Sequence, residues 1–158
     1  MKQTDNFKFD EANVMNELVY RNLSEDAKRQ ICAWKYGGEY DLYNLPAYEE
    51  MQVRQIGFMN PQREKNYYGF WDESILVGFV NILEEKEEVF IGIGVNPDLC
   101  NKHYGQRMLL ITYEISKKLY PDKPLYLEVR TWNIRAVKCY KKAGFRSDGQ
   151  AYELATGM

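Results

Sequence analysis

An asparagine and a tyrosine in the last third of the chain are spaced so that both could serve one reaction. Asn133 stands at the end of a predicted strand and the start of a predicted helix, and Tyr140 lies two turns into that helix. This spacing puts both side chains along one helix face. The amide can anchor an amide-bearing ligand, and the phenol can protonate a leaving group. The alternative is structural, with Asn133 as a helix cap and Tyr140 as a packed aromatic residue.

A second candidate lies upstream, where a predicted strand over 89–95 leads through a loop into a helix that begins near Gly105. A helix N-terminus offers unpaired N–H groups and a partial positive charge, which suit a pyrophosphate. Gly105 allows a ligand to approach the backbone closely, and Lys102 and Arg107 add positive charge. On its own, the segment also fits an ordinary strand-to-helix crossover that contains a glycine.

Together the two segments resemble the GCN5-related N-acetyltransferases. The matching positions are residues 93–99 followed six residues later by Gly105, and then Asn133, Ala136, Tyr140, Gly144 and Phe145. The resemblance extends over residues 15–150, and its specific motifs lie in 89–145. The second block is most similar to that of the bacterial ribosomal-protein alanine N-acetyltransferases.

The resemblance implies acetyl-coenzyme A as cofactor. Its pantetheine is expected to pair with the strand edge at Ile93, Gly94 and Val95, as an added strand would. The pyrophosphate is expected on the loop and helix start formed by Cys100, Asn101, Lys102, His103, Tyr104, Gly105 and Gln106. By the same resemblance Asn133 contacts the cofactor, Tyr140 protonates the departing thiolate, and Glu128 is the general base, directly or through water.

The chain departs from the family pattern in two places. Cys100 stands where the family has Gln or Arg, and His103 stands where it has its first loop glycine. The His103 side chain could donate to a phosphate or narrow the site. The family fold also closes with a strand after the one that begins at Phe145. Here we expect that strand to be missing, shortened or supplied by a partner, or its edge to be covered by residues 1–14.

The elements that position these residues follow from hydrophobic periodicity and turn signals. Strands are predicted over 17–23, 66–71, 75–83, 89–95 and 125–129 and from 145, and helices over 24–36, 48–58, 104–120 and 134–143. This order predicts an α/β (α+β) domain. The resemblance makes it a GNAT fold, a mixed, mostly antiparallel sheet of about six to seven strands, splayed between the fourth and fifth and flanked by about four helices. Residues 1–14 are predicted as an N-terminal arm and 15–158 as a single acetyltransferase domain.

Composition argues against several function classes. The chain has 158 residues, of which 45% are hydrophobic, and a net charge of −2, as expected for one globular domain. The scattered basic residues argue against a nucleic-acid partner, and no apolar run approaches the roughly 18 residues of a membrane span. Three scattered cysteines and one histidine predict neither a metal site nor a disulfide framework, and favour the cytoplasm.

We therefore expect an acyltransferase that moves the acetyl group from acetyl-CoA to a primary amine by direct attack in a ternary complex. The alternative is a non-catalytic CoA-binding regulatory module, or an interaction module with the tyrosine-rich residues 36–48 as its contact surface. The acceptor is left open between a small-molecule amine, such as a polyamine, an amino acid or an antibiotic, and a peptide amine. A homodimer is also left open.

Overall fold

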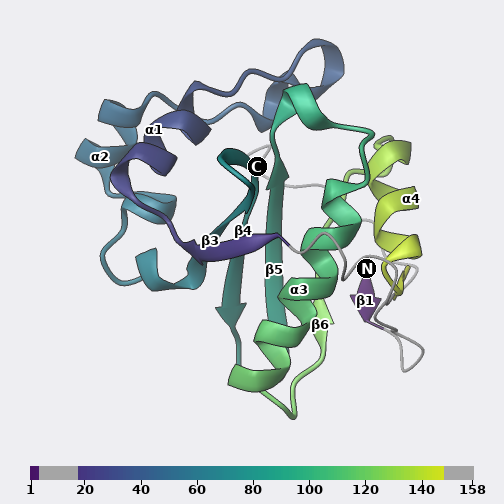
Figure 1. The fold of residues 1–158 in the computed structure, drawn as a ribbon. Helices are drawn as coiled ribbons and strands as arrows, with labels where there is room; N and C mark the ends of the chain where they lie inside the picture. Colours follow the sequence, from purple (N-terminus) through teal and green to yellow (C-terminus); the bar gives the residue numbers. More distant parts are fainter. Residues whose placement is uncertain (4–17, 148–158) are drawn as a thin grey trace.

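The computed structural model describes residues 1–3 and 18–147 of the chain. Their centre is a seven-stranded sheet in the order β2-β3-β4-β5-β6-β1-β7. Neighbouring strands are antiparallel except β5 and β6, which are parallel. Figure 1 shows α3 running along the central strands, α4 beside it, and α1 and α2 gathered on the side away from α4. The predicted mixed, mostly antiparallel sheet with four flanking helices is confirmed.

Valine, isoleucine and aromatic residues dominate the central strands, as is typical of buried sheet positions. The strands are β1 (Lys2–Gln3), β2 (Val19–Asn22), β3 (Tyr67–Asp72), β4 (Ile75–Glu84), β5 (Val89–Val95), β6 (Leu125–Tyr126) and β7 (Phe145–Arg146). Alternate residues of each central strand face α3, so the opposite face of the sheet carries a second set of side chains.

The four α-helices begin where the sequence supplies a cap or a turn. They are α1 (Glu25–Ala33), α2 (Tyr48–Arg54), α3 (Tyr104–Leu119) and α4 (Ile134–Lys142). Ser24 caps α1, because its Oγ accepts a hydrogen bond from the Ala27 N–H at 3.1 Å. The apolar face of α3 is buried except at Leu119, which is half exposed although its spacing predicts burial.

The splay of the sheet lies between β5 and β6, which are the fourth and fifth strands when counting starts at β2. These two strands pair only at Val89 with Leu125 and at Phe90 with Tyr126. Beyond Phe90 the strands separate, so the second half of β5 has no strand neighbour on that side. The predicted position of the splay is confirmed.

The first residues of the chain lie inside the sheet. β1 runs antiparallel to both of its neighbours, with Lys2 opposite Tyr126 of β6 and opposite Arg146 of β7. The Met1 amino group donates to the Leu127 carbonyl, and the Leu127 N–H donates back to the Met1 carbonyl at 2.9 Å. The beginning of the predicted arm thus fills the place between β6 and β7. The rest of that arm lies outside the described residues, and so do residues 148–158, where the prediction of a missing or shortened closing strand would be tested.

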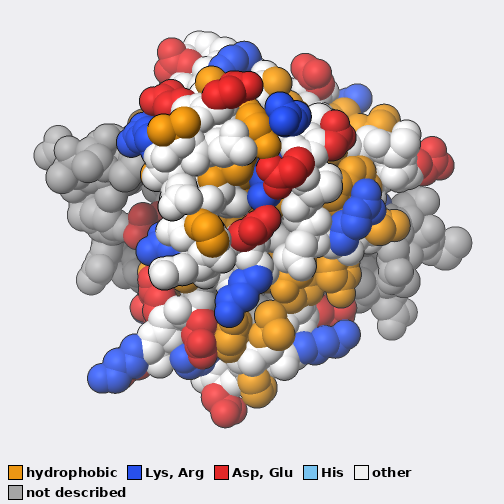
Figure 2. Space-filling view, turned by 90° about the vertical axis from the view of Figure 1, so that its left-hand side faces the viewer, with side chains coloured by type: hydrophobic (Ala, Val, Ile, Leu, Met, Phe, Trp, Pro, Cys, Tyr) orange, Lys and Arg blue, Asp and Glu red, His pale blue; other side chains and the backbone are white. Residues whose placement is uncertain are grey.

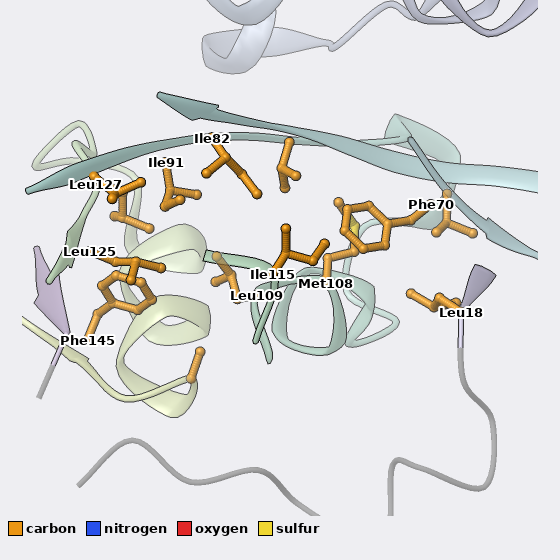
Figure 3. Packing of buried hydrophobic residues seen from close by; sticks show 14 residues of the cluster. Leu18, Phe70, Ile82, Ile91, Met108, Leu109, Ile115, Leu125, Leu127 and Phe145 are labelled. Atoms are coloured by element: carbon orange, nitrogen blue, oxygen red, sulfur yellow. The ribbon is translucent and has the colours of Figure 1, made fainter. Parts of the chain in front are cut away.

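The main core forms between α3 and the face of the sheet that α3 covers. Figure 3 shows Ile82, Ile91 and Leu127 pointing from their strands toward Met108, Leu109 and Ile115 of α3. A second buried cluster on the opposite face holds α1 and α2 against Trp71 and Leu76. This arrangement covers one face of the sheet with α3 and leaves part of the other face free of α1 and α2.

Three predicted elements are shorter in the structure. The helix over 24–36 ends at Ala33, since Trp34 is extended. The helix over 48–58 ends at Arg54, because Gln55 is left-handed, and a short 3₁₀ helix (Gly57–Met59) follows. The strand over 125–129 is shortened to Leu125–Tyr126, because the splay removes its neighbour on the β5 side beyond these residues.

None of the described helices is long and apolar enough to cross a membrane. On the face that carries α1 and α2, Lys and Arg side chains are interspersed with Asp and Glu side chains (Figure 2). That face therefore carries no extended field of one charge.

Candidate active site

A large cavity follows the splay between β5 and β6. Its volume is about 1440 Å³, more than the roughly 300–1,000 Å³ of a typical small-ligand pocket, so it can hold two substrates at once. Of the predicted site residues, Lys102 alone does not line it. Those that do are Ile93, Gly94, Val95, Cys100, Asn101, His103, Tyr104, Gly105, Gln106, Glu128, Asn133 and Tyr140.

The peptide groups of β5 alternate between its two sides. The Val89 N–H donates toward β6, to the Pro124 carbonyl at 2.9 Å, whereas the Asn96 N–H donates toward β4, to the Val77 carbonyl at 2.8 Å. Because successive residues of a strand direct their peptide groups to opposite sides, Ile93 and Val95 face the open splay. The strand edge that pantetheine is predicted to pair with is therefore built from alternate residues.

Gly94 directs its peptide groups toward β4, so it cannot pair with a ligand in the splay as predicted. Its lack of a side chain has another reason. A Cβ atom there would lie 2.4 Å from the Phe79 ring, which packs across the glycine. Gly94 thus makes room for an aromatic wall of the cavity.

The loop before α3 has two residues in the left-handed conformation, Asn101 with φ 68° and His103 with φ 65°. Glycine adopts positive φ most readily, which accounts for the family glycine at the position of His103. Here the histidine keeps that backbone conformation. His103 is also the N-cap of α3 and makes no side-chain cap, so it leaves the first N–H groups of this 16-residue helix to other acceptors.

The N-terminal end of α3 contacts β3 on one side and α4 on the other. The Tyr104 hydroxyl donates to Asp72 Oδ2 at 2.6 Å, which ties the helix to the end of β3. At Gly105 a Cβ atom would lie 3.0 Å from the Cys139 sulfur of α4. The close approach of α3 and α4 therefore favours a glycine at this position, independently of any ligand that approaches the backbone there.

Asn133 caps α4 and Tyr140 lies two turns along it, and both line the cavity. The Asn133 Oδ1 accepts the Ala136 N–H at 3.1 Å, so the residue is a helix cap, and its Nδ2 donates to the Tyr43 hydroxyl at 3.0 Å. Burial raises the pKa of Tyr140, and the neighbouring Cys139, Tyr43 and Tyr36 raise it further. The Tyr140 hydroxyl is thus protonated at neutral pH and can donate its proton.

Part of the tyrosine-rich segment that the interaction alternative makes a contact surface spans the splay. We call residues 36–44, which include a 3₁₀ helix (Gly38–Tyr43), the tyrosine loop. On one side the Tyr36 hydroxyl donates to the Val95 carbonyl at 2.5 Å. On the other side Tyr43 meets Asn133, and the Tyr40 ring lies 5.6 Å from that of Trp132. The tyrosine loop therefore bridges the two sides of the cavity.

Glu128 projects from the face of the sheet opposite α3. Burial alternates along 125–128, so Glu128 shares its face with Tyr126, and the Glu128 side chain is exposed to solvent. The Tyr126 hydroxyl donates to Glu85 at 2.7 Å. Burial raises the pKa of Tyr126, with further contributions from Glu85, Glu128 and Glu88. Glu88 and Glu128 line this end of the cavity together with Lys2, which pairs with Glu88 at 3.6 Å. The Glu128 carboxylate can attract a cationic amine.

The cysteines are poorly suited to act as nucleophiles. All three are free, and burial raises the pKa of Cys139 to about 11 and that of Cys100 above its ordinary value. Both thiols are therefore protonated at neutral pH, and a thiolate is the reactive form. The described residues contain no group of three or more His, Cys, Asp or Glu residues that could hold a metal ion.

Three solved structures that share the fold illustrate the likeness. A chimera of the Vibrio cholerae spermidine N-acetyltransferase SpeG with human SSAT sequence gives a TM-score of 0.71 at 20% identity, over 84% of this chain and 82% of that one. A GNAT acetyltransferase from Bacillus anthracis gives 0.67 at 18% identity, over 94% and 86%. A domain from Methanocaldococcus jannaschii gives 0.66 at 18% identity, over 87% and 93%. At these identities the likeness concerns the fold.

Sequence comparison identifies the family. No curated protein sequence matches the chain. The model of the acetyltransferase (GNAT) family matches residues 29–145, which include the splayed strands, the loop before α3 and the whole of α4. That family uses acetyl-CoA as its acetyl donor. The chain belongs to the acetyltransferase (GNAT) family.

Proposed function

We propose that this enzyme transfers the acetyl group of acetyl-CoA to a primary amine of a small molecule, by direct attack within a ternary complex. The observation that carries the proposal is the one cavity that joins an open strand edge, an uncapped helix N-terminus, a protonated tyrosine and an exposed glutamate. The spermidine N-acetyltransferase named above favours a small-molecule amine over a peptide. We also propose that the protein works in the cytoplasm, on the cysteine pattern.

Acetyl-CoA would lie along the splay. Its pantetheine amides would pair with the outward peptide groups of Ile93 and Val95, and its pyrophosphate would accept N–H groups from the start of α3 at Tyr104, Gly105 and Gln106. At Val95 the cofactor would compete with the Tyr36 hydroxyl, which donates to the same carbonyl. Pairing with the cofactor is thus coupled to a movement of the tyrosine loop.

The proposed reaction needs two proton transfers. Glu128 takes a proton from the ammonium group, so that the free nitrogen can attack the thioester carbonyl carbon. A new C–N bond forms and the C–S bond breaks. Tyr140 donates its proton to the departing thiolate and takes back the second proton of the attacking nitrogen. Overall an ammonium ion and a thioester give an amide, a free thiol and one proton released to solvent.

The proposal is tested by calorimetric titration with acetyl-CoA and by thiol release with a panel of amines. We expect binding, amine-dependent thiol release, and a loss of about 10²- to 10⁴-fold in kcat for Tyr140→Phe with little change in acetyl-CoA affinity. Absence of binding at millimolar acetyl-CoA would refute the proposal. Binding without release on any amine would favour the regulatory alternative.

A further inference from the structure

Three aromatic rings form one wall of the cavity, on the face of the sheet opposite α3. They belong to Trp34, which follows α1, to Tyr67 of β3 and to Phe79 of β4. The centroid of the Phe79 ring lies 6.3 Å from that of Trp34 and 6.4 Å from that of Tyr67. We call these three residues the aromatic wall. Each of them is only half-buried, so the wall leaves aromatic surface that a bound molecule can cover.

The aromatic wall lies beside the strand edge that is proposed to pair with pantetheine. Phe79 is the partner of Gly94 across β4 and β5, and its ring packs over that glycine, where a Cβ atom would lie 2.4 Å away. The residues on either side of Gly94, which are Ile93 and Val95, direct their peptide groups into the splay. Only the width of β5 therefore separates the wall from the proposed course of pantetheine. A short linker between a ring on the wall and a reacting amine suffices to join the two.

No charged side chain accompanies the aromatic wall along its part of the cavity. The described cavity-lining residues between positions 31 and 81 are all uncharged, and Ile31 and Leu45 extend the apolar surface. Among the described residues, the carboxylates that line the cavity are those of Glu88, just before β5, and Glu128, just after β6. A cation at the wall would lose water and meet neither carboxylate, and attraction by the ring faces compensates for only part of that loss. The wall therefore suits an uncharged apolar group, and above all a flat ring.

From this arrangement we propose that the acceptor is a primary amine with one aromatic ring and no second positive charge, and that its ring packs on the aromatic wall. The inference rests on the proposed function, since it concerns the acceptor of the same reaction. Trp34, Tyr67 and Phe79 are then specificity-determining residues. They hold the ring by burial of its apolar surface and by edge or offset contacts between rings, while the amine extends over β5 toward the thioester.

Two pairs of amines test the ring and the charge separately. 2-Phenylethylamine differs from ethylamine by its phenyl ring alone. We expect its kcat/KM to be about 10- to 100-fold higher, chiefly through KM, because the wall buries the ring. Cadaverine differs from n-pentylamine by a second amino group, which is charged at neutral pH. We expect its kcat/KM to be about tenfold lower than that of n-pentylamine, since a charged end at the wall loses water and gains no carboxylate.

Neighbouring tyrosines on opposite faces of β3 supply a matched pair of variants. Tyr67→Leu removes a ring of the aromatic wall, whereas Tyr68→Leu removes a ring that packs against the main core and does not line the cavity. Both substitutions should lower Tm. Only Tyr67→Leu should lower the preference for 2-phenylethylamine over ethylamine, by about twofold to about tenfold. Trp34→Leu, at the end of α1, should have the same effect and replaces Tyr67→Leu in the test if that variant does not fold.

The outcomes separate the inference from the function on which it rests. Equal kcat/KM for 2-phenylethylamine and ethylamine, or a higher value for cadaverine than for n-pentylamine, would overturn the inference and leave the proposed function intact. A preference for the ring that survives both Tyr67→Leu and Trp34→Leu, or that Tyr68→Leu lowers equally, would do the same. If acetyl-CoA does not bind, or no amine is acetylated, the proposed function itself fails and the inference fails with it.

Discussion

Replacing Tyr36 by phenylalanine removes the hydrogen bond that joins the tyrosine loop to β5. In the structure the Tyr36 hydroxyl donates to the Val95 carbonyl at 2.5 Å, and burial raises the pKa of Tyr36, so the donor stays protonated. Pantetheine is proposed to use the same carbonyl. The native contact therefore competes with the cofactor, and its loss should favour binding.

The size of the effect follows from the strength of the contact. A hydrogen bond of this kind contributes about 0.5–1.5 kcal/mol net. Since each 1.4 kcal/mol or so is a tenfold change in Kd, Tyr36→Phe should tighten acetyl-CoA binding by about twofold to about tenfold. The free variant should also lose about 1 kcal/mol of its free energy of unfolding, because Val95 loses a partner.

Calorimetric titration and chemical denaturation measure the two effects on the same samples. Tyr48→Phe is the matched control, since the Tyr48 hydroxyl donates to Glu25 at 2.6 Å in the α1–α2 cluster, away from the cavity. It should lower the free energy of unfolding and leave Kd unchanged. If Tyr36→Phe destabilises the protein and Kd stays the same or rises, Tyr36 does not compete with the cofactor and the coupling to the tyrosine loop is wrong.

Three further predictions concern other parts of the chain. Glu128→Gln should lower kcat by about 10²-fold or more at neutral pH, with a smaller loss at high pH where the amine is already deprotonated; a pH-independent loss would argue against a base. Gly94→Ala should lower the free energy of unfolding by about 1–3 kcal/mol in urea denaturation, because the Phe79 ring must move, and an unchanged midpoint would contradict this packing. Hydrogen bonds from Lys28 and Tyr48 hold the pKa of Glu25 below 4.5, so this contribution to stability is present above that pH and is lost as pH falls through the lower folded pKa. Lys28→Met should therefore make stability less dependent on pH in acid unfolding, and an unaltered profile would exclude the contribution.

The parts of the site that lie within one element could be predicted from the sequence. Asn133 and Tyr140 share a helix, so their spacing alone brings them to one face, and the structure keeps them together. The strand–loop–helix around Gly105 is also local. The left-handed conformation of His103 in this loop could not be predicted from hydrophobic periodicity, which carries no information on φ. The only indication was that His103 stands where the family has a glycine.

Contacts between distant segments could not be predicted. The contact of Tyr36 with Val95 joins residues 59 positions apart, and no periodicity marks a loop that crosses a cavity. At Asn81 the sequence shows a polar residue between Val80 and Ile82 in an apolar strand. It does not show that the side-chain oxygen of Asn81 is buried without a hydrogen-bond donor among the described residues, because that depends on the neighbouring strands. A two-residue strand such as β1 is too short for any alternating pattern to identify it.

The placement of β1 has a consequence for how the molecule assembles. Met1 and Leu127 are hydrogen-bonded although 126 positions separate them. Pairing of such distant segments closes a long loop, which is slow and entropically unfavourable. During synthesis β1 must therefore remain unpaired until β6 and β7 have emerged. β1 thus joins strands that are made long after it, so loosening either β1 or β7 should release the other and expose the edge of β6 to proteases.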